Sequence, residues 1–152
     1  DDKHLHEFQF PTGDAVIRIG LSGLDPFEDD DKTMASWETP LKDWFPGAQG
    51  QCVYVYDFGD DWIHRVTLES RRPAEPRGRY PRCTGGERRG PPEDVGGPHG
   101  YLQFLEALSN PRHEDHRMYK EWIGVPWDAE DFRPGDVEFS SPSRRLRWAG
   151  LG

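Results

Sequence analysis

The sequence predicts an α+β fold, a single-domain α/β roll in which a mixed or antiparallel sheet built on two hairpins packs against two or three helices. Three observations lead to this class. Alternating, strand-like runs lie in the first half of the chain, amphipathic helical runs lie in the second half, and a long segment rich in proline and glycine joins the halves. A length of 152 residues suits one domain that spans residues 1–152.

Composition and charge restrict the classes of function. The apolar content of 34% is low, so the aromatic residues, 12% of the chain, have to provide much of the core. A formal net charge of -9 argues against a general nucleic-acid-binding surface, because phosphate affinity comes from clustered Lys and Arg. The basic clusters at residues 71–89 and 144–147 are interpreted as a solvated loop and a solvated helix face, with sequence-specific DNA binding as the alternative.

The cysteines and the hydropathy bear on the cellular compartment. Two cysteines, Cys52 and Cys83, do not make a disulfide framework and indicate reduced thiols. No apolar run approaches the roughly 20 residues that a membrane-spanning helix needs, and the first residues show no signal-peptide core. We therefore expect a cytoplasmic protein that does not interact with a membrane.

The first hairpin is predicted from two alternating runs, His4–Phe10 and Ala15–Ile19, with the turn at Pro11–Asp14. His4 and His6 lie two residues apart on one strand face, a spacing that could serve a metal ion. The sequence fixes no third ligand, and the phenylalanines on the same face favour simple packing. Packing is therefore the preferred interpretation.

Residues 21–33 are predicted to form an acidic surface loop, because four carboxylates in a row at 28–31 would repel one another in a compact element. Calcium binding is the alternative, but the ligand spacing of an EF-hand is missing. Ser36 or Thr39 then caps a predicted short helix that contains Leu41, Trp44 and Phe45.

The central hairpin is predicted over residues 51–69, with strands at Cys52–Tyr56 and Trp62–Leu68. Strand alternation places His64 on the face of Trp62, Val66 and Leu68, so a buried imidazole with a hydrogen-bond partner is expected. The predicted partner is Asp57, a carboxylate of Glu93 or Asp94, or a backbone carbonyl near them. This bond would tie the long loop to the hairpin, and a structural role is preferred to a functional one.

The segment 71–100 is predicted to be a long loop, because its prolines and glycines exclude a regular helix or a central strand. Loops of this length are usually functional or disordered. Two prolines stiffen the backbone before Glu93 and Asp94, which precede a helix start near Pro98. Capping of that helix by the two carboxylates is slightly preferred to a ligand site.

Helices are predicted at residues 98–109 and 113–123 from the spacing of their apolar residues. His113 and His116 could bind a metal ion, but a solvated lead-in to the second helix explains them more simply. Three shorter elements follow: a helical turn at 128–132, a strand at 137–139, and a helix at 144–148 capped by Ser140 or Ser141.

A series of motifs resembles the plasmid pRiA4b ORF-3-like family over nearly the whole chain. The motifs are at residues 4–8, 54–64, 80–83, 91–97, 100–101, 110–113 and 127–132. The resemblance implies a small α+β roll found on plasmids, on transposons and in bacterial and archaeal genomes, without implying a reaction. Some relatives carry a transposon-passenger or resolvase-like label, but this chain lacks a serine-recombinase pattern.

Two departures from the family pattern matter. The family often has cysteines where this chain has Gly90 and Val95, so a site of several cysteines is not expected. The family also begins with a strand and a helix ahead of the His4–His6 strand, and these elements are absent from the sequence. The absence predicts an open sheet edge or an exposed apolar face, and therefore self-association or a protein partner.

The preferred functional hypothesis is a non-catalytic interaction or accessory module without a cofactor. An alternative is a metal-assisted hydrolase or nuclease that uses Asp57, His64, Glu93 and Asp94 around a divalent ion, with His64, Glu93 and Asp94 as weak metal ligands. A DNA-binding accessory protein is the third hypothesis. The candidate functional surface comprises Asp57, Asp60, Asp61, Trp62, His64, Tyr80, Cys83, Glu93 and Asp94.

Overall fold

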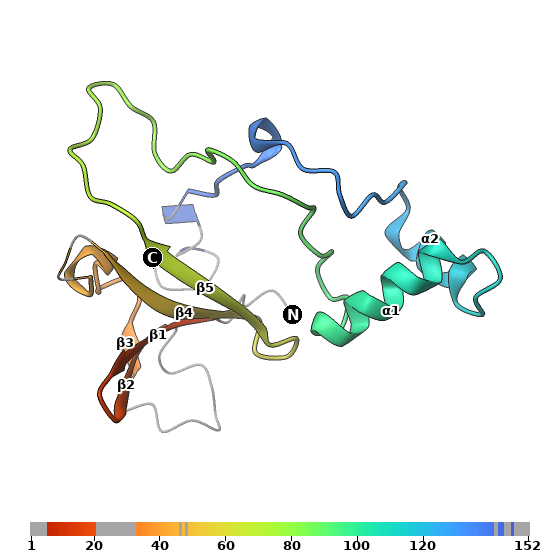
Figure 1. The fold of residues 1–152 in the computed structure, drawn as a ribbon, viewed down its shortest axis with the longest axis horizontal. Helices are drawn as coiled ribbons and strands as arrows, with labels where there is room; N and C mark the ends of the chain where they lie inside the picture. The colour runs from red at the N-terminus through yellow and green to blue at the C-terminus, as the bar shows by residue number, and fades with distance from the viewer. Residues whose placement is uncertain are drawn as a thin grey trace. The chain divides into compact units, whose positions relative to one another are not determined.

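The structure is a computed structural model that describes residues 6–20, 33–45, 47, 49–141, 143, 144 and 147. The predictions for His4, for the loop up to residue 32 and for most of the helix at 144–148 lie outside the described residues. The chain divides into two compact units, Asp1–Pro76 with Leu146–Gly152, and Arg77–Arg145. The α+β class is confirmed, with a five-stranded mixed sheet and two α-helices (Figure 1).

The first unit contains the sheet, whose strand order is β3-β2-β1-β4-β5. Its strands are β1 (His6–Thr12), β2 (Ala15–Gly20), β3 (Thr33–Ala35), β4 (Gly50–Tyr56) and β5 (Trp62–Leu68). Both predicted hairpins are present, and their strands pair antiparallel. The first turn is tighter than predicted, because Thr12 pairs with Ala15 and only two residues reverse the chain. Gly13, with a φ of 62°, supplies the left-handed conformation there.

Two short elements between the hairpins differ from the prediction. Strand β3, which was predicted only as the end of a loop, pairs parallel with β2. Three residues are too few to show an alternating pattern, so only the neighbouring strand defines it. The predicted helix is the 3₁₀ helix η2 (Leu41–Asp43), which follows Pro40 and has no side-chain cap. The cap prediction for Ser36 or Thr39 is therefore wrong.

The core of the first unit lies on one face of the sheet. Its buried residues are Phe10, Ile19, Phe45 and Cys52, and five partly buried side chains pack against them: Phe8, Ile17, Trp44, Val66 and Leu68. The Phe45 ring lies directly on Gly50, where a Cβ atom would come within 2.6 Å of Phe45 Cδ1. Phe45 also meets the Phe10 ring edge-on at a centroid distance of 5.2 Å. Trp44 and Phe45 thus cover one end of this face.

The second unit contains α1 (Gly97–Ser109), α2 (His116–Ile123) and the 3₁₀ helix η3 (Pro134–Asp136). Helix α1 agrees closely with the prediction, whereas α2 begins at His116 instead of residue 113. The reason is a turn after α1, where the Arg112 and His113 amides donate to Asn110 Oδ1 and Asn110 O. The strand predicted at 137–139 is wrong, because none of the described strands pairs with these residues.

The core of the second unit is organised around one fully buried ring, Phe104. Three rings meet it edge-on at centroid distances of 5.5, 5.8 and 5.4 Å: Tyr119, Trp122 and Trp127. The long loop is irregular, as predicted, and is held against the segment after α2. The Arg89 amide donates to Ala129 O at 2.9 Å, and its guanidinium lies 4.1 Å from the Trp127 ring centre. None of the helices in the described parts of the chain has both the length and the apolar character to cross a membrane.

Candidate functional site

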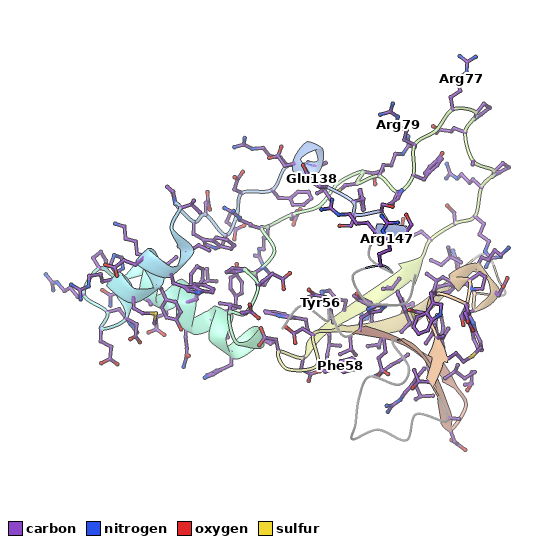
Figure 2. The ribbon with its side chains drawn as sticks, turned by 180° about the vertical axis from the view of Figure 1, so that it is seen from behind. Tyr56, Phe58, Arg77, Arg79, Glu138 and Arg147 are labelled. Atoms are coloured by element: carbon purple, nitrogen blue, oxygen red, sulfur yellow. The ribbon has the colours of Figure 1, made fainter. Side chains whose placement is uncertain are left out.

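The acidic turn of the central hairpin is built by Asp57. Its Oδ1 accepts the amides of Gly59 at 3.0 Å and Asp60 at 3.3 Å, and its main-chain oxygen accepts the Asp61 amide at 2.6 Å. Asp57 and Asp61 both adopt left-handed conformations, with φ of 55° and 53°. Figure 2 shows Tyr56 and Phe58 beside this turn, at the end of the hairpin. The Asp57 carboxylate therefore already has a structural role.

His64 lies on the predicted face of β5 but is exposed, so the prediction of a buried imidazole is wrong. β5 ends the sheet, and the covering aromatics lie at the opposite end of this face, over Gly50. His64 Nδ1 lies 3.1 Å from Trp62 O and 3.3 Å from Tyr54 O. Since carbonyls only accept, Nδ1 carries the hydrogen and donates within its own hairpin. Nδ1 therefore bonds backbone carbonyls of the hairpin instead of a carboxylate.

Tyr54 gathers three rings on the same face of the sheet. Its centroid lies 4.7 Å from Phe8, 5.6 Å from His64 and 6.0 Å from His6. The strand register explains this cluster, because Tyr54 pairs with both Phe8 and His64. Strand alternation alone assigns Phe8 and His64 to faces of separate hairpins and does not reveal Tyr54 as their link.

Tyr80 and Cys83 belong to the second unit. Tyr80 is half exposed and lies over Gly78, where a Cβ would come within 2.6 Å of its ring. The Cys83 thiol donates to Gly85 O at 3.4 Å and is partly exposed. By contrast, Cys52 lies in the sheet core, and burial raises the pKa of its thiol. Both cysteines are free thiols, as predicted.

Glu93 and Asp94 are exposed and precede α1. Helix α1 is preceded by Gly96 in a left-handed conformation and has no side-chain cap, so the predicted capping by these carboxylates is wrong. In the part of the chain that the structure describes, no three His, Cys, Asp or Glu side chains form a group suited to a metal ion. Asp57 and His64 belong to the first unit and the other two residues to the second, and the four-residue metal site stays a prediction.

His116 connects the two helices of the second unit. Its Nδ1 donates to Ala107 O at 2.8 Å, a carbonyl in the last turn of α1 that lacks a helical partner. Asp115 N–H donates to His113 Nδ1 at 3.1 Å, so both imidazoles organise the turn between the helices. The interpretation of a solvated lead-in is wrong for these half-buried residues. The bond to Ala107 depends on the approach of two helices, which sequence spacing does not reveal.

Two hollows combine apolar walls with basic side chains, and each is lined by residues of one unit. The first, which we term the β5 groove, has a volume of about 580 Å³ and is formed by Leu41, Lys42, Phe45, Val66–Leu68 and Ser70–Arg72. The second, the α2 cavity, has a volume of about 470 Å³ and lies among Leu108, three residues of α2 (His116, Lys120 and Ile123) and Gly124–Trp127. Neither lining contains an Asp or Glu, although the chain carries a net charge of -9. Neither hollow is predictable from local sequence patterns, since each combines segments from separate elements.

Known proteins place these features in a family. The family model of the plasmid pRiA4b ORF-3-like protein matches residues 1–136. The uncharacterized protein y4hQ of Sinorhizobium fredii is 38% identical over 101 residues, which is 63% of this chain and 50% of that protein. The chain thus spans about half the length of this curated relative.

A solved structure gives the same result for the fold. The crystal structure of MM3350, a protein of unknown function from Methanosarcina mazei, has a TM-score of 0.77 and 37% sequence identity to this chain. The similarity covers 91% of this chain and 75% of MM3350. The family predicted from the hairpin, loop and helix motifs is therefore confirmed, and the chain belongs to the plasmid pRiA4b ORF-3-like family.

Proposed function

We propose that the protein is a non-catalytic interaction module, an accessory domain that binds an extended acidic segment of a partner protein along β5. The observation that carries this proposal is the combination of an end strand and an adjoining cationic groove. β5 pairs only with β4 among the described strands. Its other edge therefore offers the main-chain groups to which an added strand can bind.

The exposure of β5 side chains supports an accessible strand. Ile63 is 66% exposed, and His64, Arg65 and Thr67 are exposed as well. Seven residues make β5 as long as β4, so the strand offers a full-length template for pairing. An accessible edge of this length is a site where natural sheets accept another strand.

The β5 groove supplies selectivity beside that edge. Leu41, Phe45, Val66 and Leu68 give it apolar walls that suit every second side chain of an added strand. The Arg71 guanidinium donates to the carbonyls of Lys42 and Phe45 and so fixes the 3₁₀ segment against the strand.

The charge of the groove supports an acidic partner segment. Lys42 and Arg72 are exposed, and with Arg71 they make three cations in a lining that has no carboxylate. A cationic groove on an acidic protein attracts a segment with acidic side chains and disfavours basic ones. We therefore assign the groove to an acidic segment with alternating aliphatic residues.

A labelled peptide tests the assignment. The probe is a capped seven-residue peptide of alternating Glu and Val, with a Lys and Val peptide as its counterpart, and fluorescence anisotropy measures the affinity. The acidic peptide should bind, and Arg72→Glu should weaken it about fivefold, since an exposed ion pair is worth up to about 1 kcal/mol. Added salt should also weaken binding, because it screens exposed charges.

Arg112→Glu is the matched control, because Arg112 is exposed and lies in the other unit. This variant changes the net charge equally and should leave the affinity unchanged. Amide shifts on the bound protein should fall on β5 and the groove. Equal binding of the basic peptide, or an equal loss in Arg112→Glu, would contradict the proposal.

A further inference from the structure

The α2 cavity has the features of a site for a small ligand and is separate from the β5 groove. All of its lining belongs to the second unit, and its volume of about 470 Å³ falls within the range of about 300–1,000 Å³ typical of small-molecule sites. Leu108, Ile123, Val125 and Pro126 supply apolar walls. A ligand therefore needs an apolar body to fill it.

Few polar side chains line the cavity. Lys120 is an exposed ammonium on α2, and it lines the cavity together with His116. His116 Nδ1 donates to Ala107 O, which fixes the ring and leaves Nε2 without a partner among the described residues. With no acidic residue in the lining, nothing within the cavity neutralises Lys120.

Trp127 adds an independent observation. Its indole Nε1–H is closed off from solvent and is the buried side-chain donor that has no acceptor among the described residues. A buried donor without an acceptor is unusual in a folded protein. Arg89 and Phe104 pack on the same indole and hold its plane, so the N–H cannot turn freely to find water. A ligand oxygen that penetrates to the indole would supply the missing acceptor.

From these groups we propose that the α2 cavity binds a small free carboxylic acid with an aliphatic body. Its carboxylate accepts from both the Lys120 ammonium and the Trp127 indole N–H, which line the same cavity, and its chain lies on Leu108, Ile123 and Val125. A charged hydrogen bond to an ammonium selects the carboxylate over a neutral head group, while the apolar walls favour longer chains. A protein C-terminus carries the same carboxylate, so the source of the acid has to be tested separately.

The test uses three compounds that differ only in their head groups: hexanoate, hexanamide and hexylamine. Titration of ¹⁵N-labelled protein should show that hexanoate shifts the amides of residues 116–127 and the Trp127 indole resonance. Its affinity should exceed that of hexanamide by about fivefold, a factor consistent with one partly exposed charged contact. Hexylamine should bind more weakly than both.

Variants identify the contact. Lys120→Met keeps the aliphatic stem and should reduce hexanoate affinity to that of hexanamide, while Lys120→Arg should retain it. Arg117→Met is the control, because Arg117 is highly exposed on the same helix, pairs with Glu121 and does not line the cavity. Its affinity for hexanoate should match that of the unmodified protein.

Several outcomes would overturn the proposal. Equal affinities for the three compounds would show that the cavity does not recognise the carboxylate. Equal effects of Lys120→Met and Arg117→Met would show that Lys120 does not make the contact. Amide shifts confined to the β5 groove, or no shifts at all, would show that hexanoate does not bind in the α2 cavity. A capped peptide with a free C-terminal leucine that binds more tightly than hexanoate would assign the cavity to a protein terminus, against a free acid.

Discussion

In the first unit, four buried residues from β1, β2, β4 and the segment before β4 share the core: Phe10, Ile19, Cys52 and Phe45. In the second unit, a single ring, Phe104, is fully buried, and the surrounding aromatic rings are each partly exposed. The first core is distributed over a hydrogen-bonded sheet, whereas three aromatic rings of the second core converge on one side chain of one helix, Phe104. Single substitutions should therefore affect the second unit more strongly.

The largest effect is expected for Phe104→Ala. Removing this ring deprives Tyr119, Trp122 and Trp127 of their common partner and should cost about 3–5 kcal/mol. Hydrogen exchange should show lost protection in α1 and α2, with protection retained in β4 and β5. Leu102→Ala, at a 66% exposed position of α1, is the control and should change stability by less than about 0.5 kcal/mol. Equal loss of protection in both units would contradict this contrast.

One glycine in each unit lies at a close contact, and replacing each by alanine compares how well the two units tolerate an added Cβ atom. A Cβ on Gly100 would lie 2.1 Å from Val95 O, and one on Gly50 would lie 2.6 Å from Phe45 Cδ1. Backbone yields less easily than a ring, so Gly100→Ala should cost near the upper end of about 1–3 kcal/mol and Gly50→Ala near the lower end. Chemical denaturation measures both. Gly85→Ala, where a Cβ meets nothing within 4 Å, should have little effect, and the reverse order of the first two would refute the argument.

The smallest changes in stability are expected for one histidine from each unit. His116→Ala removes the donor to Ala107 O and should cost about 1 kcal/mol, because a partly buried carbonyl loses its partner. His64→Ala should cost less than about 0.5 kcal/mol. The His64 ring is exposed, so water can take its place as the donor to the backbone carbonyls. Thermal unfolding measures both, and His116→Asn, which keeps a donor, should recover part of the loss. A larger loss for His64→Ala would show that the hairpin ring is the more important one.

Local patterns in the sequence determined the two hairpins of the first unit and helix α1 of the second. Alternation along residues 4–19 and 51–69 predicted the two hairpins and assigned His64 to the face of Val66, because side chains in a strand alternate whatever its neighbours. The spacing of Tyr101, Phe104 and Leu108 likewise defined α1. The family motifs depend on the same local residues, and the family was therefore also predictable.

Only the tertiary structure decided which of these surfaces are covered. Alternation gives a face for His64, but exposure follows from the position of β5 at the end of the sheet. In the same way, His116 bonds Ala107 O, and Lys120 lines one cavity with the segment after Gly124, because two helices and a turn come together. The β5 groove joins Leu41, Lys42 and Phe45 to Val66–Leu68 and Ser70–Arg72 for a similar reason. Periodicity reports interactions between near neighbours along the chain, whereas strand order, burial and hollows depend on contacts between segments far apart in sequence.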